Sequence, residues 1–355
     1  SMTIGEITSA KSNYGYREKI DTKTIIEHTS VNPTKPLHVG HARNAIIGDT
    51  MARVLKACGH DVEVQNYIDD LGLQVAQTLT EWKGEDSEEK FDHYLGKLYV
   101  DFHERAEEDP SLERDARDVL SQLESGEGEL AEKAREMASR CVRSNLETSD
   151  NLNVDYDLLV WESDISRTGM LKKTLDWLKE TPYLVEGEGK HEGALVLKLD
   201  EFGLEDKVMI RSDGTAVYTA RDLAYQLWKF GEIDIDLYFK NHSKRPSGIE
   251  TYTTSPKGEP NRDFGNATQV INVIGVEQKY TQNVVFAALK SLDLEKEYEN
   301  SHHLAYEHVR LPSKKFKGRE GTWIGYSVDD VLEDTLSRAK EEVKKRNPEA
   351  ENDFV

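Results

Sequence analysis

Hydrophobic residues in the first eighty positions alternate between strand-like runs and a helical repeat. The run Ile25-Ile26-Glu27 reads as a short strand, and from His41 to about Lys56 apolar residues recur at helical spacing. Val62–Ile68 predicts a second strand, which Asp69–Gly72 closes before another helix. Two strands joined through a helix are expected to lie parallel, with a right-handed crossover.

The pattern changes between about Lys83 and Leu152, where charged residues and helical periodicity replace the strand signals. Pro110 and Gly126-Glu127-Gly128 interrupt this stretch. We interpret it as an acidic helical insertion between the two halves of a sheet. Its run of charges is most simply a solvated helical face.

Strand signals return at residues 157–161 and alternate with turns and helices to the end of the chain. Three short runs, at 181–188, 194–199 and 208–211, predict antiparallel strands. Beyond them the pattern predicts a helix at 219–230, a strand at 235–239, a loop or hairpin at 240–266, a buried strand at 270–274, a helix at 277–292 and a strand near 308–311. This alternation predicts an α/β fold: a doubly wound, Rossmann-like parallel sheet with helical and antiparallel insertions.

We divide the chain where these patterns change. The predicted segments are a lead-in (1–22), the first half of a nucleotide-binding domain (23–82), the acidic helical insertion (83–152), the second half of that domain (153–300) with its antiparallel insertion (181–218), and a Lys/Gly-rich loop with the start of further helices (301–355).

Composition narrows the class of protein. The 355 residues carry a net charge of −21, and much of the acid lies between Glu81 and Asp150. This charge argues against a broad nucleic-acid surface, although basic residues gather at Lys240–Arg245 and Lys314–Arg319. Two cysteines lack metal or disulfide spacing, and no apolar run is long enough to span a bilayer. We therefore expect a soluble cytoplasmic protein without contact to a membrane.

The most informative chemistry lies between the first strand and the first long helix. There His38-Val39-Gly40-His41 stands at the start of the helix. Free amides and the helix dipole converge at such a start and favour an anion, and a glycine lets a phosphate approach closely. Two imidazoles beside it suit charge stabilisation on a nucleotide triphosphate. The alternative is a capped turn whose histidines are merely solvated.

The residues around this tetrad carry a resemblance to a known family. The segment from Glu27 to Asn44 reads Glu-His-Thr-Ser-Val-Asn-Pro-Thr-Lys-Pro-Leu-His-Val-Gly-His-Ala-Arg-Asn. It resembles the class I aminoacyl-tRNA synthetases, whose first signature is His-Ile-Gly-His. More narrowly, it is similar to the arginyl-tRNA synthetases. The resemblance runs from Glu27 to about Leu332.

The resemblance implies that ATP is the nucleotide and that His38, Gly40 and His41 contact its phosphates. The second signature of the family is a Lys-Met-Ser-Lys-Ser loop, and this chain offers Lys-Phe-Lys-Gly-Arg from Lys315 to Arg319. Gly318 replaces the second lysine of the signature, which many arginyl enzymes offset with a lysine upstream of the first signature. The resemblance therefore assigns the main cation to Lys35. The assisting cations are Lys315, Lys317 and Arg319. The alternative for this loop is an exposed basic segment without a catalytic role.

A second motif is similar to the family's Asp-Gly-x-x-x-Tyr-x-x-Arg-Asp and begins at Asp213. It implies that Asp222 pairs with the guanidinium of arginine and that Tyr218 forms a wall of the pocket. These two residues lie four apart, so they share one side of a helix. The other residues that the resemblance assigns to the amino acid are Glu27, Ser30, Asn32 and Gln278. Glu27 and Asn32 could instead cap the turn that follows the first strand.

Gly275-Val276-Glu277-Gln278 stands where a strand meets a helix, which is where open α/β sheets bind nucleotides. The family commonly has Gly-Ala-Asp-Gln there, so Gly275 and Glu277 are expected to face the ribose. The backbone near Val309 is expected to meet the adenine. The implied cofactors are ATP and Mg²⁺, with no residue assigned to hold a metal. The implied partners are L-arginine and tRNA(Arg), and we expect a monomer.

Family members usually have one domain before this core and an anticodon-binding domain after it, and we expect this chain to lack both. We therefore expect binding of ATP and arginine but little pyrophosphate exchange without tRNA. Two other readings remain open. One is a different class I synthetase, such as that for cysteine or glutamate, although these lack the Tyr-x-x-Arg-Asp motif. The other is a non-catalytic relative that senses arginine or ATP.

Overall fold

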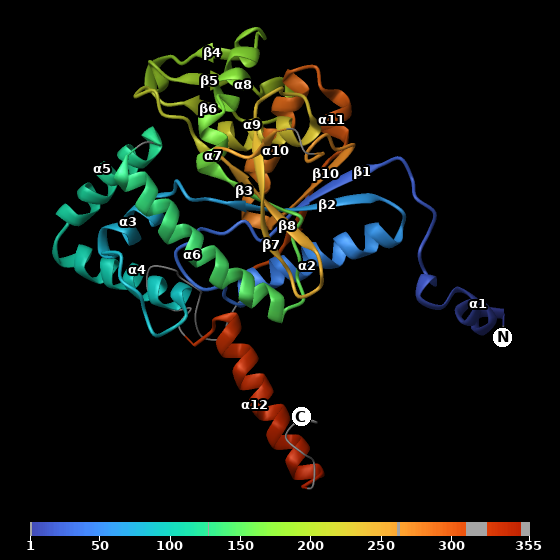
Figure 1. Cartoon of the computed structure of the whole chain (residues 1–355). Coiled ribbons are helices and arrows are strands. Elements are labelled where there is room, and N and C mark those ends of the chain that lie inside the picture. The colour runs from blue at the N-terminus through green and yellow to red at the C-terminus, as the bar shows by residue number, and fades with distance from the viewer. Residues whose placement is uncertain (1, 127, 261–262, 310–324, 349–355) are drawn as a thin grey trace. The chain divides into compact units, whose positions relative to one another are not determined.

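A computed structural model describes residues 2–126, 128–260, 263–309 and 325–348. The chain divides into two units, each of which is described by itself. The sheet unit comprises residues 1–30, 46–67 and 155–307. The helical unit comprises residues 31–45, 68–154 and 308–355. Figure 1 labels the elements of both.

The sheet unit is built on eight strands in the order β11-β10-β1-β2-β3-β8-β7-β9. Their bounds are β1 Lys23–Glu27, β2 Asp61–Ile68, β3 Leu158–Trp161, β7 Tyr238–Lys244, β8 Glu250–Ser255, β9 Glu259–Pro260, β10 Gln269–Gly275 and β11 Ser301–Tyr306. The run β11-β10-β1-β2 is parallel, as is the pair β3-β8. The strand predicted at 235–239 begins at Tyr238. The last strand lies at 301–306, ahead of the one predicted near 308–311, of which residues 310 and 311 lie outside the described residues.

Helices cover the sheet because its central strands are apolar on both faces. Ile25 in β1 and Val270 in β10 are completely buried neighbours. In Figure 1 the C-terminal part of α2 (Val39–Ala57) lies beneath β1 and β2, and α9 (Tyr218–Phe230) and α10 (Lys279–Ser291) lie above. This is the doubly wound arrangement that the alternation of strands and helices predicts. The remaining helices of the unit are α1 (Met2–Ala10), α7 (Glu162–Arg167), α8 (Met170–Lys179) and α11 (Glu295–Glu299).

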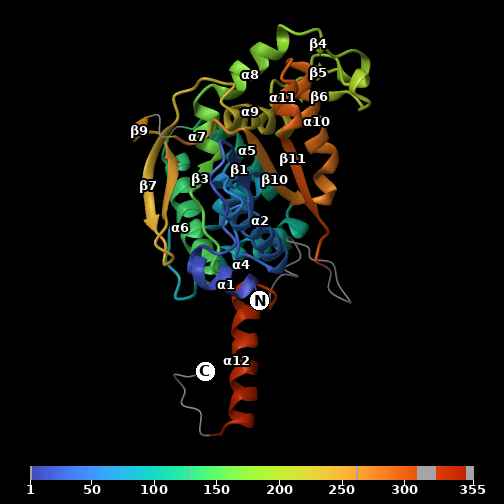
Figure 2. The same cartoon turned by 90° about the vertical axis from the view of Figure 1, so that its right-hand side faces the viewer.

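The antiparallel insertion has the predicted form. β4 (Leu184–Glu186), β5 (Leu195–Leu197) and β6 (Lys207–Ile210) pair as a separate three-stranded antiparallel sheet. Figure 2 shows this small sheet near α8. The stretch expected as a loop or hairpin contains the antiparallel pair β7 and β8, with β9 on the outer side of β7.

The helical unit contains α3 (Leu73–Glu81), α4 (Phe91–Glu108), α5 (Ser111–Ser125), α6 (Glu129–Asn151) and α12 (Val328–Arg346). The first four helices bury one apolar cluster formed by Leu71, Val75, Leu79, Trp82, Leu95, Leu123, Met137 and Cys141. Most of their charged residues are exposed or half-buried, as expected for an amphipathic bundle, and Asp92 of α4 is a buried exception. No helix among the described residues is long and apolar enough to cross a membrane.

Gly48 allows α2 to approach the turn after β1. A Cβ at this position would lie 2.3–2.5 Å from three atoms of the His28 side chain, which is completely buried. We predict that Gly48→Ala lowers the free energy of unfolding by about 1–3 kcal/mol, the usual cost of overpacking. Urea denaturation measures this loss.

Gly5→Ala is the matched control, because Gly5 also lies in a helix but a Cβ there would have no atom within 4 Å. This variant should retain or gain stability. Equal stability of the two variants would contradict the tight contact between Gly48 and His28.

Candidate active site

The turn that follows β1 holds two residues in a strained backbone conformation. Thr29 and Ser30 have φ angles of 70° and 44°, a left-handed region that non-glycine residues seldom adopt. The Thr29 hydroxyl lies 2.8 Å from the Tyr156 hydroxyl, and the Ser30 amide donates to Asn66 Oδ1 at 3.0 Å. Such strain costs of order 1–3 kcal/mol per residue and gathers at functional sites. The sequence carries no signal for it.

The histidines of the tetrad stack on each other at the start of α2. Their ring centroids are 3.6 Å apart and the planes are inclined by 17°. His38 Nδ1 accepts hydrogen bonds from the amides of Gly40 at 3.1 Å and His41 at 3.4 Å, and the amide of His38 donates to His41 Nδ1 at 3.3 Å. Since both Nδ1 atoms accept, this hydrogen-bond network assigns the proton of each ring to Nε2. The pair therefore presents N–H donors of fixed orientation.

Both rings are uncharged at neutral pH. Burial, assisted by the charge of Lys35, lowers the pKa of His38 to about 4. Burial and the neighbouring His38 also hold the pKa of His41 well below its ordinary value. Gly40 is required by this packing, because a Cβ there would lie 2.9 Å from the His38 ring. Sequence reasoning explained Gly40 by the approach of a phosphate, whereas in the structure it also admits the imidazole.

Lys35 lies in the same unit as the histidines. Its ammonium donates to Gln74 Oε1 at 3.0 Å and stands 5.5 Å from the centroid of the Tyr99 ring. Burial lowers the pKa of Lys35 to about 8, although the nearby Cys141 and Asp69 favour the charged form. Gln74 and Tyr99 were not expected from the sequence, since only the packing of α3 and α4 brings them to Lys35.

Asn32 also belongs to the helical unit. Its amide nitrogen donates to Asp69 Oδ2 at 2.7 Å, and a Cβ on Gly72 would lie 3.0 Å from the same nitrogen. Asp69 therefore orients the side chain that the family resemblance assigns to the amino acid. Sequence reasoning treated Asp69 as part of a turn and gave it no role at the site.

Glu27 and Ser30 lie in the sheet unit and are joined to each other. The Ser30 hydroxyl donates to one carboxylate oxygen of Glu27 at 3.0 Å, and the ammonium of Lys229 pairs with the other. Lys229 is 1% exposed and also donates to Asn272 Oδ1 at 2.9 Å. Glu27 thus shares its carboxylate between Ser30 and a buried ammonium, and its contact with the amino acid stays a prediction. The signal for Lys229 was a lysine within the otherwise apolar end of α9.

Tyr218 and Asp222 occupy the first and second turns of α9 in the sheet unit. Tyr218 is 55% exposed and Asp222 is half-buried. Between them Arg221 stacks 5.9 Å from the Tyr218 ring and pairs with Glu162 at 3.0 Å. The structure therefore places both predicted residues on one helix, with a fixed cation on the same turn.

Gly275 ends β10, and Glu277 and Gln278 follow in the 3₁₀ turn Val276–Gln278 of the same unit. A Cβ on Gly275 would lie 2.3 Å from the Glu277 carboxylate, so only glycine leaves this acid its position. Val309 is half-buried in the helical unit. The predicted cations Lys315, Lys317 and Arg319 lie outside the described residues.

Comparisons with known proteins show the family of the chain. Residues 3–246 match the family described as "tRNA synthetases class I (R), catalytic domain". The chain is 47% identical to the arginine–tRNA ligase of Thermococcus sibiricus and 46% identical to that of Pyrococcus furiosus, in each case over 98% of this chain and 57% of the relative. It thus spans little more than half the length of these relatives.

A solved structure shows the same fold. The arginyl-tRNA synthetase of Thermus thermophilus superposes with a TM-score of 0.82 at 38% identity, over 99% of this chain and 58% of that one. With the family match and this superposition together, the chain belongs to the class I arginyl-tRNA synthetases and carries residues of their catalytic domain.

Proposed function

We propose that this chain forms the catalytic core of an arginine–tRNA ligase. It would activate L-arginine with ATP to give arginyl-adenylate and transfer the arginyl group to tRNA(Arg). The observation that supports this most directly is the stacked pair His38 and His41, whose Nε2–H groups are held ready by backbone hydrogen bonds. We further propose a monomer that works in the cytoplasm, where tRNA is charged.

In the proposed reaction the carboxylate of arginine attacks the α-phosphorus of ATP, and the bond to pyrophosphate breaks. Negative charge then grows on the leaving oxygens. His38 and His41 would donate Nε2–H to these oxygens, and the ammonium of Lys35 would neutralise part of the charge. A preorganised donor of this kind contributes on the order of 3 kcal/mol to barrier lowering. Neutral histidines suit the role because they donate without a change of protonation state.

Mg²⁺ would accompany ATP as the counter-ion of its phosphates. Among the described residues one group of possible ligands, Asp92, His93 and Asp329, has the right spacing for a metal. The ammonium of Lys90 already stands 2.7 Å from Asp329, so this group does not fit a resident metal ion. We therefore assign no residue of the chain to hold Mg²⁺.

Selection of arginine would depend on Asp222 and Tyr218. A guanidinium has donors on every edge and no acceptor, so its pocket needs carboxylates and carbonyl-type oxygens. Asp222 and Glu27, which also pairs with Lys229, are the two carboxylates proposed for this pocket. Asn32, Ser30 and Gln278 remain the proposed contacts of the α-amino and α-carboxyl groups. Gly275, Glu277 and Val309 remain the proposed contacts of adenosine.

Calorimetry with a non-hydrolysable arginyl-adenylate analogue tests the function itself. We expect the arginyl analogue to bind at least about 10³-fold more tightly than the lysyl analogue, because lysine would leave buried acceptors unpaired. Equal affinities would indicate that the site does not select a guanidinium. No binding of either analogue would remove the proposed function.

Asp222→Asn tests the guanidinium contact. The substitution keeps the shape but removes the charge, so the KM for arginine should rise by about 10²-fold, as for loss of a buried charge-assisted pair. The KM for ATP should stay unchanged in arginine-dependent pyrophosphate exchange with tRNA present. Asp234→Asn, an equal change of charge at an exposed position, is the control. An unaltered KM for arginine in Asp222→Asn would place the pocket elsewhere.

The pKa of Lys35 predicts a pH dependence. Lysine is cationic below its pKa, and burial lowers the pKa of Lys35 to about 8 in the protein without substrate. The value of kcat/KM for ATP should therefore fall as the pH rises through about 8. Lys35→Met should lower kcat/KM at pH 7 and abolish this fall. Lys35→Arg keeps the charge at every pH and should also abolish the fall, while retaining more activity than Lys35→Met. A wild-type profile that stays flat up to pH 9.5 would exclude Lys35 as the cation.

A further inference from the structure

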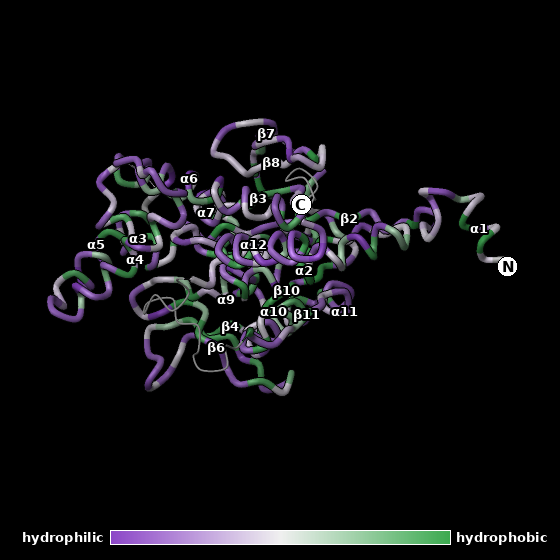
Figure 3. Tube along the Cα trace, turned by 90° about the horizontal axis from the view of Figure 1, so that it is seen from below, coloured by the Kyte–Doolittle hydropathy of each residue, from purple (hydrophilic) through white to green (hydrophobic). Residues whose placement is uncertain are grey.

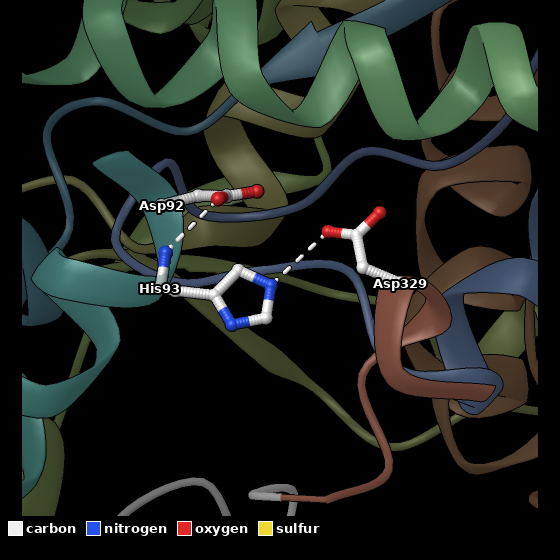
Figure 4. A group of neighbouring side chains, drawn as sticks. All are labelled: Asp92, His93 and Asp329. Atoms are coloured by element: carbon white, nitrogen blue, oxygen red, sulfur yellow. Dashed lines mark hydrogen bonds and ion pairs between the residues drawn. The ribbon is translucent and has the colours of Figure 1, made fainter. Parts of the chain in front are cut away.

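The carboxylate of Asp329 joins three helices of the helical unit. Asp329 belongs to the first turn of α12, and its Oδ2 lies 2.7 Å from Lys90 Nζ and 3.0 Å from His93 Nε2. Thr148 of α6 donates its hydroxyl to Oδ1 at 2.9 Å. Lys90 directly precedes α4 and His93 lies in its first turn. Figure 4 shows His93 and Asp329 facing each other. We call Asp329, Lys90, His93 and Thr148 the Asp329 clamp.

Lys90 supplies the positive charge of the Asp329 clamp, where a metal ion could otherwise stand. Asp92, whose side chain is completely buried, stands 3.5 Å from Lys90 Nζ and accepts a hydrogen bond from the His93 amide at 2.9 Å. Burial raises the pKa of Asp92. The hydrogen bond to Asp329 raises the pKa of His93. For Asp329 partial burial opposes ionisation, but the hydrogen bonds from His93 and Lys90 hold its pKa well below the ordinary value. The clamp is therefore an ion-pair network.

The residues just before Asp329 pair with the segment that carries His38. The amide of Val328 donates to the Leu37 carbonyl at 2.7 Å, and the amide of Val39 donates to the Tyr326 carbonyl at 3.3 Å. Ser327 and His38 stand opposite each other in an antiparallel bridge. Residues 326–328 thus pair with residues 37–39 through a single β-bridge, centred two positions before the clamped carboxylate.

Ser327 also fixes the start of α12. Its hydroxyl accepts from the Asp330 amide at 3.0 Å, and the Asp330 carboxylate accepts from the Ser327 amide at 3.2 Å, a complete capping box. Ser327 and Val328 are buried, whereas nearly every side chain from Val331 to Arg346 is exposed or half-exposed. Figure 3 shows α12 end-on as a mostly hydrophilic helix. Within the described residues α12 is therefore held at its first turn and projects from there.

We propose that Asp329 is a positioning residue: the clamp sets the register of residues 326–328 against residues 37–39 and thereby orients His38. A two-bond ladder alone is a weak restraint, and ion pairs with Lys90 and His93 tie it to α4. A displacement of the exposed part of α12 would reach His38 through the same carboxylate. The consequence for catalysis rests on the proposed function, whereas the structural consequence does not.

Hydrogen exchange of the amides of Val39 and Val328 tests the clamp without any need for catalysis. In Asp329→Asn, which keeps the shape but removes the charge, both amides should exchange on the order of tenfold faster than in the wild type. Asp334→Asn is the matched control, because Asp334 lies on the same helix in an exposed pair with Arg338. It should leave both amides unchanged. Circular dichroism checks that every variant is folded.

Unchanged exchange in a folded Asp329→Asn would overturn the proposal. The measurements are made in EDTA and repeated with Mn²⁺. Protection that appears only with Mn²⁺ would show a metal site in place of the ion-pair network, and would likewise overturn it.

A pH profile distinguishes the clamp from a general loss of stability. His93 is faced by Lys90 and Asp92 from its own helix start and by Asp329 and Asp330 from α12. Because the pKa of His93 is raised in the fold, its stabilisation is complete below pH 6.5 and is lost as the pH rises through the folded pKa. Protection of Val39, corrected for intrinsic exchange, should therefore decrease with rising pH in the wild type and become independent of pH in His93→Gln. An identical pH dependence in His93→Gln would contradict the role of His93.

If the proposed function holds, Asp329→Asn should also lower kcat for pyrophosphate exchange about tenfold, because the Nε2–H donor of His38 would be held less firmly. The KM for arginine should stay unchanged. Asp329→Glu should restore part of kcat. Faster amide exchange together with an unaltered kcat would show that the clamp orders the segment but that His38 does not serve the reaction. Absence of activity in the wild type would remove the proposed function and leave the amide result to decide the clamp.

Discussion

The hydrogen bonds that His38 accepts from the amides of Gly40 and His41 are the interaction on which the candidate site depends. A helix start has amides without partners inside the helix, and here an imidazole nitrogen takes two of them. The same contact assigns the proton of His38 to Nε2 and stacks the ring on His41. Two amides that could otherwise face an anion are therefore occupied, and the turn presents two oriented N–H donors instead.

Several buried or partly buried carboxylates are paired with lysine side chains of the same unit. Lys229 offsets Glu27 in the sheet unit, and Lys90 offsets Asp329 and Asp92 in the helical unit. Removing Lys229 would leave Glu27 without this cation, and removing Lys90 would leave the buried Asp92 without one, which costs more than such a pair contributes. These ion pairs therefore specify geometry more than they add stability.

The segment that leads from β1 to the first signature begins with two strained residues and ends in a tertiary β-bridge. Thr29 and Ser30 adopt left-handed backbone angles directly after β1, and the segment that carries His38 pairs with the residues before α12. The sequence between Ser30 and His38 is short and contains two prolines, Pro33 and Pro36. Local conformational preference alone does not impose such a path, so tertiary hydrogen bonds must maintain it.

The sequence by itself determined the fold class, the succession of strands and helices along most of the chain and the family, because hydrophobic periodicity and the motif from Glu27 to Asn44 are local properties of the chain. It also singled out Lys35, His38, Gly40 and His41, which the structure gathers in one unit, while their roles remain predictions. Only the tertiary structure decided that Lys229 sits against Glu27, that Asp69 orients Asn32 and that Asp329 is clamped by Lys90, His93 and Thr148. These partners are separated by between 37 and 239 positions, and a pattern read along the chain carries no information about which distant side chains meet when the core closes.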